Sequence, residues 1–114
     1  MITSKENIIK YFNSGIKKKD KLKIGIENKK FLFSLDTNKR VDYQTILKMF
    51  KALYEFGWKP ILEDKNIIGL KKLGKSITLE PGNQIELSGD KLENIHEACS
   101  ESQNYLFELK QVLQ

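Results

Sequence analysis

Hydrophobic and polar positions alternate along this chain with two different periods, one typical of helices and one typical of strands. The first helical pattern predicts a helix over roughly residues 4–14, which ends at Gly15. The residues behind this prediction are Thr3 and Glu6, which have the spacing of a capping box, and Ile8, Ile9 and Phe12, which form the apolar face.

A period of two over residues 22–35 predicts a strand with apolar side chains on both faces. One parity carries Leu22, Ile24 and Ile26, and the other carries Glu27, Lys29, Phe31, Phe33 and Leu35. After turn residues at positions 36–40, helical spacing returns from Ile46 to Tyr54. We therefore expect a second helix over roughly residues 43–56, ending at Gly57.

Four short strand-like runs come next, separated by short links that favour antiparallel neighbours. The runs are residues 58–62, 66–72, 76–80 and 84–88. Trp58 begins the first run and is expected in packed core. A last helix, capped by Asp90, is expected to run almost to the end of the chain. Its predicted apolar stripe consists of Ile95, Ala98, Cys99, Ser102, Leu106, Leu109 and Val112.

This order of elements predicts an α+β fold, in which helices cover one face of a mainly antiparallel sheet. A chain of 114 residues is long enough for one core, so a single domain over residues 1–114 is expected.

Composition narrows the class of protein. Cys99 is the only cysteine, which excludes an internal disulfide and a CxxC site. No apolar run approaches the roughly 20 residues of a membrane span, and an apolar leader is absent, so a cytoplasmic protein is expected. The net charge of +5 leaves one alternative open, a small basic nucleic-acid-binding domain centred on residues 17–23.

Apolar and polar side chains alternate along the two strand-like runs within residues 76–88. Alternation places Ile77, Leu79, Ile85 and Leu87 on one face, and Glu80, Gln84, Glu86 and Ser88 on the other. Carboxylate and amide oxygens suit Mg²⁺, so Glu80 and Glu86, with Glu27 from the earlier strand, are candidate magnesium ligands. The alternative is that these carboxylates only keep an exposed sheet face soluble.

Five segments in order resemble the glutamate–cysteine ligases of the plant and proteobacterial type. They are Ile24-Gly-Ile-Glu27 with Lys30-Phe-Leu-Phe33, Phe56-Gly-Trp-Lys-Pro60, Asn66-Ile-Ile-Gly-Leu70, the run from Ser76 to Gly89, and Leu92-Glu-Asn-Ile-His-Glu-Ala-Cys99. The resemblance extends over nearly the whole chain from Lys5 onward. Because members of the family are several times longer, it implies an amino-terminal fragment of a larger ligase catalytic domain.

The resemblance also implies a function. Such enzymes join the side-chain carboxylate of L-glutamate to the amino group of L-cysteine, using ATP and Mg²⁺, through a glutamyl phosphate, in the first step of glutathione biosynthesis. It implies part of a glutamine synthetase-like ligase fold, with Glu27, Glu80 and Glu86 as metal ligands and Gln84 near the substrate. It assigns no catalytic residue here and puts most ATP contacts beyond position 114, so the fragment alone is expected to be inactive and to need the carboxy-terminal portion.

One departure from the family pattern concerns the metal ligands. The family usually has Glu-His-Glu-Lys-Phe, whereas this chain has Glu27-Asn-Lys-Lys-Phe31. Asn28 therefore replaces the histidine, and Lys29 stands where a second glutamate is expected. A lysine brings a cation in place of an oxygen donor and would repel a metal. The alternative function is therefore a truncated, non-catalytic remnant or binding domain of the same fold.

Overall fold

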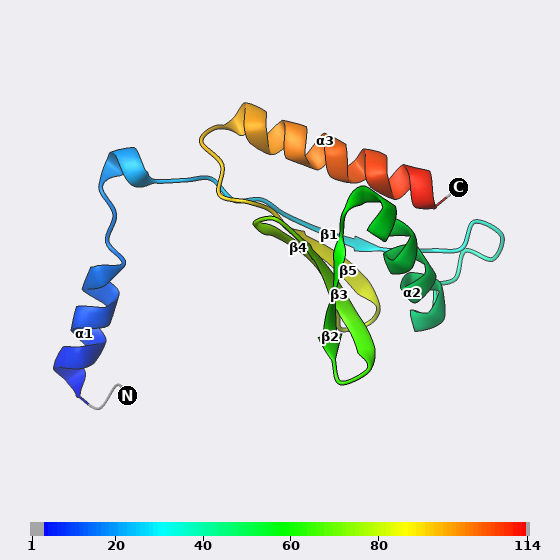
Figure 1. Ribbon diagram of the computed structural model, residues 1–114, viewed down its shortest axis with the longest axis horizontal. Coiled ribbons are helices and arrows are strands. Elements are labelled where there is room, and N and C mark those ends of the chain that lie inside the picture. Colours follow the sequence, from blue (N-terminus) through cyan, green and yellow to red (C-terminus); the bar gives the residue numbers. More distant parts are fainter. Residues whose placement is uncertain (1–3, 114) are drawn as a thin grey trace.

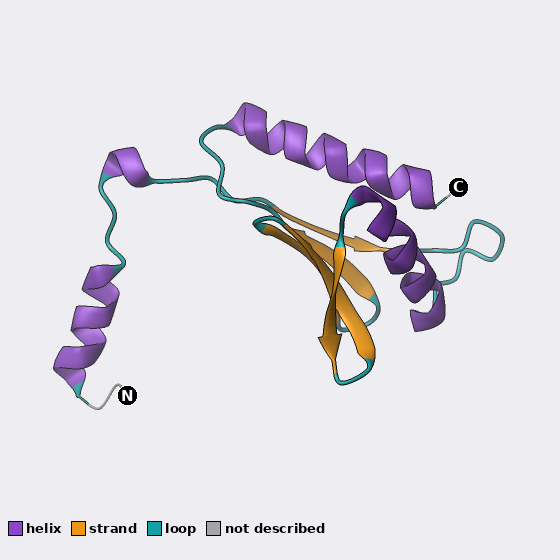
Figure 2. Cartoon of the chain, viewed as in Figure 1, coloured by secondary structure: helices purple, strands orange, loops and turns teal. Residues whose placement is uncertain are grey.

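The computed structural model describes residues 4–113 and has the expected α+β architecture, with five antiparallel strands and three α-helices (Figure 1, Figure 2). In chain order the elements are α1 (Lys5–Ser14), the 3-10 turn η1 (Lys19–Lys21), β1 (Glu27–Phe31), α2 (Tyr43–Ala52), the 3-10 turn η2 (Leu53–Phe56), β2 (Lys59–Glu63), β3 (Asn66–Lys72), β4 (Lys75–Glu80), β5 (Gln84–Ser88) and α3 (Ile95–Val112). Within these residues, no helix is long and apolar enough to cross a membrane.

The sheet has the strand order β1-β5-β4-β3-β2. Strands β2 to β5 form consecutive hairpins with short loops, as the sequence predicts. The loop between β4 and β5 bends at Gly82, whose φ of 75° is accessible to glycine without a side-chain clash. Strand β1 comes from much earlier in the chain and pairs with β5 at the edge of the sheet.

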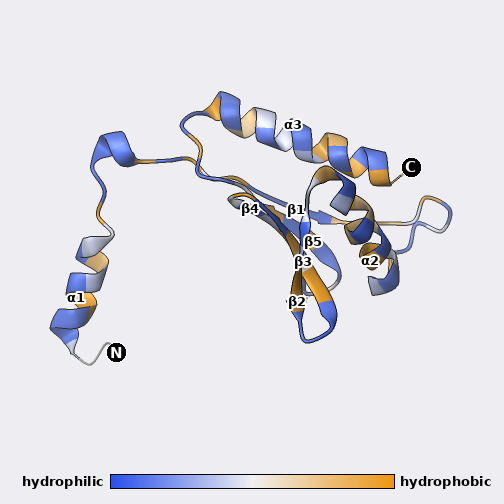
Figure 3. Ribbon diagram, in the orientation of Figure 1, coloured by the Kyte–Doolittle hydropathy of each residue, from blue (hydrophilic) through white to orange (hydrophobic). Residues whose placement is uncertain are grey.

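The hydrophobic core lies between one face of the sheet and the two helices α2 and α3, where apolar residues gather (Figure 3). The helices contribute Ile46, Met49, Phe50, Tyr105 and Leu109, η2 contributes Leu53, and the sheet side contributes Trp58, Leu70, Ile77, Ile85 and Leu87. The expected burial of Trp58 is thus confirmed, at 3% exposure. The sequence correctly predicts the face with Ile77, Leu79, Ile85 and Leu87 as the covered one.

Helix α2 begins where the carboxylate of Asp42 accepts the backbone N–H of Thr45 at 2.8 Å. This hydrogen bond lowers the pKa of Asp42. The helix tightens into η2 for its last turn, and the chain leaves it through Gly57 with φ of 85°. Together the two elements occupy the range expected for the second helix.

Helix α3 begins later than predicted, and the expected Asp90 cap is wrong. Asn94 is the cap, and its side-chain oxygen accepts the N–H groups of His96 and Glu97 at 3.0 and 3.1 Å. Asp90 instead accepts the N–H of its neighbour Lys91 and lies in the loop before the helix.

The buried side of α3 also differs from the predicted apolar stripe. Its buried residues are Ala98, Glu101, Tyr105 and Leu109, whereas Cys99 and Ile95 are exposed. The reason is a charged residue at an interior position. The Glu101 carboxylate accepts the backbone N–H of Asp90 at 3.1 Å and faces the Lys75 ammonium at 3.6 Å. A prediction based only on apolar residues misses this helix face, because its buried carboxylate has hydrogen-bond and ion-pair partners.

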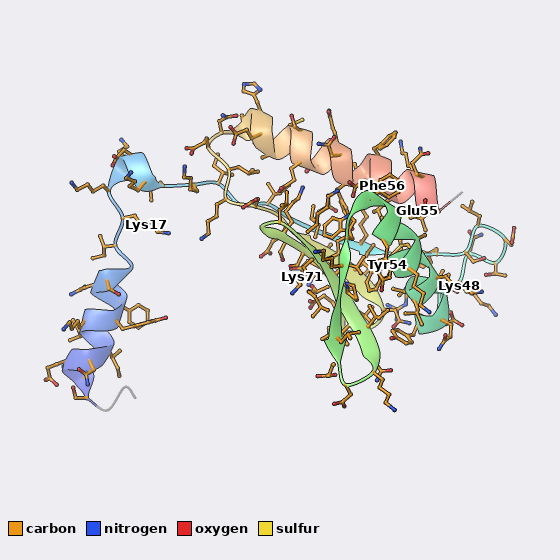
Figure 4. The ribbon with its side chains drawn as sticks, viewed as in Figure 1. Lys17, Lys48, Tyr54, Glu55, Phe56 and Lys71 are labelled. Atoms are coloured by element: carbon orange, nitrogen blue, oxygen red, sulfur yellow. The ribbon has the colours of Figure 1, made fainter. Side chains whose placement is uncertain are left out.

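Helix α1 forms near the expected range but buries none of its residues. Ser4 caps it by accepting the N–H of Asn7, while the predicted capping residue Thr3 lies outside the described residues. In Figure 1 the helix lies apart from the sheet, joined to it by an extended connector. The basic residues 17–23 belong to this connector, and Figure 4 places Lys17 well away from the sheet.

Strand β1 is shorter than the period-two pattern over residues 22–35 suggests. On either side of it only isolated bridges form, between Ile24 and Leu92 and between Phe33 and Arg40. Leu35, at the end of the pattern, is 95% exposed.

Glu108 ties α3 to the end of the sheet. One of its carboxylate oxygens accepts the indole N–H of buried Trp58 at 2.6 Å, and the other accepts the Lys72 ammonium at 2.7 Å. Replacing Glu108 by alanine leaves the indole N–H without its acceptor. We expect the free energy of unfolding to fall by about 2 kcal/mol in urea denaturation. The same change at exposed Glu55 should cost less than about 0.5 kcal/mol, and equal losses would contradict this role of Glu108.

Candidate functional site on the open face of the sheet

The face of the sheet opposite α2 and α3 carries mainly polar side chains in three rows, with Phe31, Gly69 and Ile61 as the exceptions. Residues directly opposite each other on antiparallel strands point to the same face, so the strand register defines the rows. The first is Glu27, Ser88, Ser76, Lys71 and Lys59, the second is Lys29, Glu86, Thr78, Gly69 and Ile61, and the third is Phe31, Gln84 and Glu80. The sequence correctly groups Glu80, Gln84, Glu86 and Ser88 on one face.

Lys29 lies at the centre of the acidic part of this face. Its ammonium nitrogen is 2.5 Å from Oε2 of Glu86 and 3.8 Å from Oε2 of Glu80. The hydrogen bond with Glu86 raises the pKa of Lys29, and the negative charges of the neighbouring glutamates act in the same direction. The side chain of Glu86 is only 14% exposed. The ion pair is therefore largely covered on its glutamate side, while the Lys29 side chain is 46% exposed.

Glu80 and Gln84 are held by other polar groups near the turn between β4 and β5. The hydroxyl of Thr78 donates to Oε1 of Glu80 at 3.0 Å. The amide of Gln84 donates to the carbonyl oxygen of Pro81 at 2.9 Å. Both side chains therefore stay on the open face, where the sequence predicts a metal ligand and a substrate contact.

The predicted ligands are only partly brought together. Glu80 and Glu86 approach a common point, but that point is taken by the Lys29 ammonium. Glu27 lies in the neighbouring row, opposite Ser88. Across residues 4–113, no group of three His, Cys, Asp or Glu side chains is arranged to hold a metal ion.

The residues present do not fit a divalent cation between Glu80 and Glu86. A protonated lysine has three N–H donors and no lone pair to offer a metal. The cation that these carboxylates contact already belongs to the protein. No metal binding is tested by these contacts, so the metal-binding roles of Glu27, Glu80 and Glu86 stay predictions from the sequence.

Sequence reasoning missed one residue at the edge of this face. The Arg40 guanidinium lies 5.0 Å from the centre of the Phe31 ring, in a cation–π geometry. A side chain at Gly82 would come within 3.3 Å of Arg40, so the glycine leaves room for it. Arg40 thus stands beside the row that holds Gln84. The available signal was that Arg40 is the only arginine in a lysine-rich chain.

The other end of the open face is basic. Lys59 and Lys71 are opposite each other on β2 and β3, and Figure 4 shows where Lys71 leaves β3. With Gly57, Lys72 and Leu73 they line an open hollow of about 560 Å³. The face therefore carries positive charge over β2 and β3 and mainly negative charge over β4, β5 and β1.

Comparison with known proteins identifies relatives along nearly all of the chain. Glutamate–cysteine ligase A, chloroplastic, of Oryza sativa subsp. japonica is 43% identical over 110 residues, which is 96% of this chain and 22% of the rice protein. The chloroplastic glutamate–cysteine ligases of Nicotiana tabacum and Arabidopsis thaliana are each 42% identical over 110 residues, or 21% of their length. No family model matches the chain.

The predicted cytoplasmic location is contradicted by these relatives, because their names place them in chloroplasts. The error has a physical reason: the prediction relied on the absence of an apolar leader, whereas transit peptides to plastids are amphipathic and rich in serine and arginine. The absence of an apolar leader therefore does not distinguish a cytoplasmic protein from a plastid protein.

The similarity confirms the resemblance expected from the five ordered segments. The similarity is limited to one part of these ligases, since the chain spans about a fifth of the length of the relatives it matches. Sequence identity of 41–43% over 96% of the chain makes this protein a homologue of one part of the glutamate–cysteine ligases.

Proposed function

We propose that this chain forms one wall of the substrate site in a glutamate–cysteine ligase, which joins L-glutamate to L-cysteine with ATP. The observation that carries the proposal is the identity of about two residues in five with such ligases along 96% of the chain. The open sheet face agrees with it, because a polar face left uncovered by the helices is available to small, charged substrates.

The chain's own residues suit binding and positioning. L-glutamate carries two carboxylates, which require cationic or N–H partners. Arg40, over the Phe31 ring, offers a planar guanidinium, and Gln84, opposite Phe31 in the strand register, offers an amide. We propose that they orient glutamate, and that phosphoryl transfer from ATP to its side-chain carboxylate uses residues outside this chain. We propose the use of ATP and Mg²⁺ only for the longer protein, and not at the position of Lys29.

A second candidate is a non-catalytic domain of the same fold, and one observation favours it. The Lys29 ammonium occupies the space between two carboxylates that were predicted to hold magnesium. A protein with this arrangement could retain binding without turnover. The two functions differ in a measurable product, gamma-glutamylcysteine.

A chimera tests the proposal. The matching 110 residues of the tobacco ligase are replaced by those of this chain, and ATP-dependent formation of gamma-glutamylcysteine is measured. We expect turnover, and we expect Arg40→Met to raise the KM for glutamate roughly tenfold or more through loss of a charge-assisted contact. Lys48→Met, at an exposed helix position near Arg40 in sequence, is the matched control.

The outcome separates the two functions. A folded chimera that forms no product, but gains activity with Lys29→Glu, would identify the chain as a non-catalytic remnant. An unchanged KM in Arg40→Met would remove Arg40 from the substrate site.

A further inference from the structure

The ion pair between β1 and β5 lies within the strand pairing of the sheet, unlike an ordinary surface salt bridge. Lys29 and Glu86 are direct partners in the strand register, at the middle of both strands. The next residue across the sheet is Thr78, which leaves the neighbouring carboxylate of Glu80 facing the same ammonium. The cation therefore faces one carboxylate from each of two other strands, β4 and β5.

We propose that the Lys29 ammonium permanently takes the place of a divalent cation between Glu80 and Glu86, so that this sheet face binds no metal at that point. The inference goes beyond the proposed function and does not depend on turnover. Lys29 thereby acts as a cation built into the chain, which offsets one of the negative charges of Glu80 and Glu86 without any ion from solution.

Charge and space both support this role. A metal entering between the carboxylates would have to displace an ammonium that is 2.5 Å from Glu86, and would then lie beside its positive charge. The side chain of Glu86 is 14% exposed and that of Lys29 is 46% exposed, so water screens this repulsion only from the lysine side. Displacement would also leave the long Lys29 side chain without its carboxylate partners.

The lysine also explains why the carboxylates can gather here without a metal. Glu80, Glu86 and Glu27 all act on Lys29 electrostatically. Without a cation, Glu80 and Glu86 would repel each other on one face of the sheet. Removing the lysine charge should therefore destabilise the fold and at the same time create an affinity for divalent cations.

The experiment measures binding of Mn²⁺, as a probe for divalent cations, to the 114-residue chain by electron paramagnetic resonance, with no substrate present. Four proteins are compared: the wild type, Lys29→Glu, Lys29→Gln, and Lys71→Gln as a control that removes another positive charge from the same face. We expect Lys29→Glu to bind Mn²⁺ at least roughly tenfold more tightly than the wild type, because a third carboxylate replaces the ammonium. Lys71→Gln should bind like the wild type.

Thermal unfolding supplies a second readout. Mg²⁺ should raise the midpoint of Lys29→Glu and Lys29→Gln and leave that of the wild type unchanged. If Lys29→Glu is unfolded without metal, Mn²⁺ should restore its near-ultraviolet circular dichroism. The proposal is overturned if the wild type binds Mn²⁺ as tightly as Lys29→Glu. It is equally overturned if Lys29→Glu neither binds Mn²⁺ more tightly nor refolds with it.

Discussion

Replacing Phe50 by alanine is expected to remove about 3–5 kcal/mol from the free energy of unfolding, because it empties the centre of the core. Phe50 lies on α2, is fully buried, and is among the largest buried side chains of the protein. Domains of this size are stable by only about 5–15 kcal/mol. The substitution should therefore bring the protein close to, or past, the point at which it unfolds at room temperature.

Urea denaturation followed by circular dichroism measures this effect. The matched control is Phe107→Ala on α3, where the same side chain is 59% exposed. Its removal should change the free energy of unfolding by less than about 0.5 kcal/mol. Equal losses for the two variants would mean that the packing between α2 and the sheet is not the main source of stability.

Gly69→Ala is expected to cost about 1–3 kcal/mol, or more, for a different reason. Gly69 lies in β3, and an added Cβ would come within 2.6 Å of the carbonyl oxygen of Ile77 on the neighbouring strand. Contacts under 3.0 Å force something to move, and here the obstacle is backbone. Strands β3 and β4 would separate locally, so Thr78, the donor to Glu80, would shift as well.

Thermal unfolding and amide chemical shifts test this prediction together. Gly25→Ala is the matched control, because an added Cβ there meets nothing within 4 Å. We expect Gly69→Ala to lower the midpoint of unfolding and to perturb amide signals along β3 and β4, while Gly25→Ala leaves both nearly unchanged. If the two variants are equally stable, the close approach at Gly69 is not a constraint on the sheet.

Local signals predict much of the fold. The runs at 66–72 and 84–88 match β3 and β5, because each ends at turn chemistry and alternates clearly. The start of α3 was missed because two acceptors compete for the same role. Asp90 and Asn94 are both good caps, and in the structure the Glu101 carboxylate binds the backbone N–H of Asp90 from inside the fold. That contact is tertiary and leaves no local trace in the sequence.

The candidate site, like the fold, has features that local patterns predict and features that depend on tertiary contacts. Alternation alone predicts that Glu80, Gln84 and Glu86 share a face, because the side-chain period of a strand is two. The register between β1 and β5 cannot be predicted from alternation, since it depends on how two distant strands align. The contact between Lys29 and Glu86 therefore required the structure, and so did the position of Arg40 over Phe31.

The placement of β1 at the edge beside β5 has a consequence for how the protein folds. Strands β2 to β5 are joined by short loops and can pair as local hairpins, whereas β1 must close a loop that contains α2 and three strands. We therefore expect β1 to join the sheet last and to separate from it first. A chain in that state would keep a four-stranded sheet. Because Lys29 lies on β1, the sheet would then lack the cation that faces Glu86 in the folded protein.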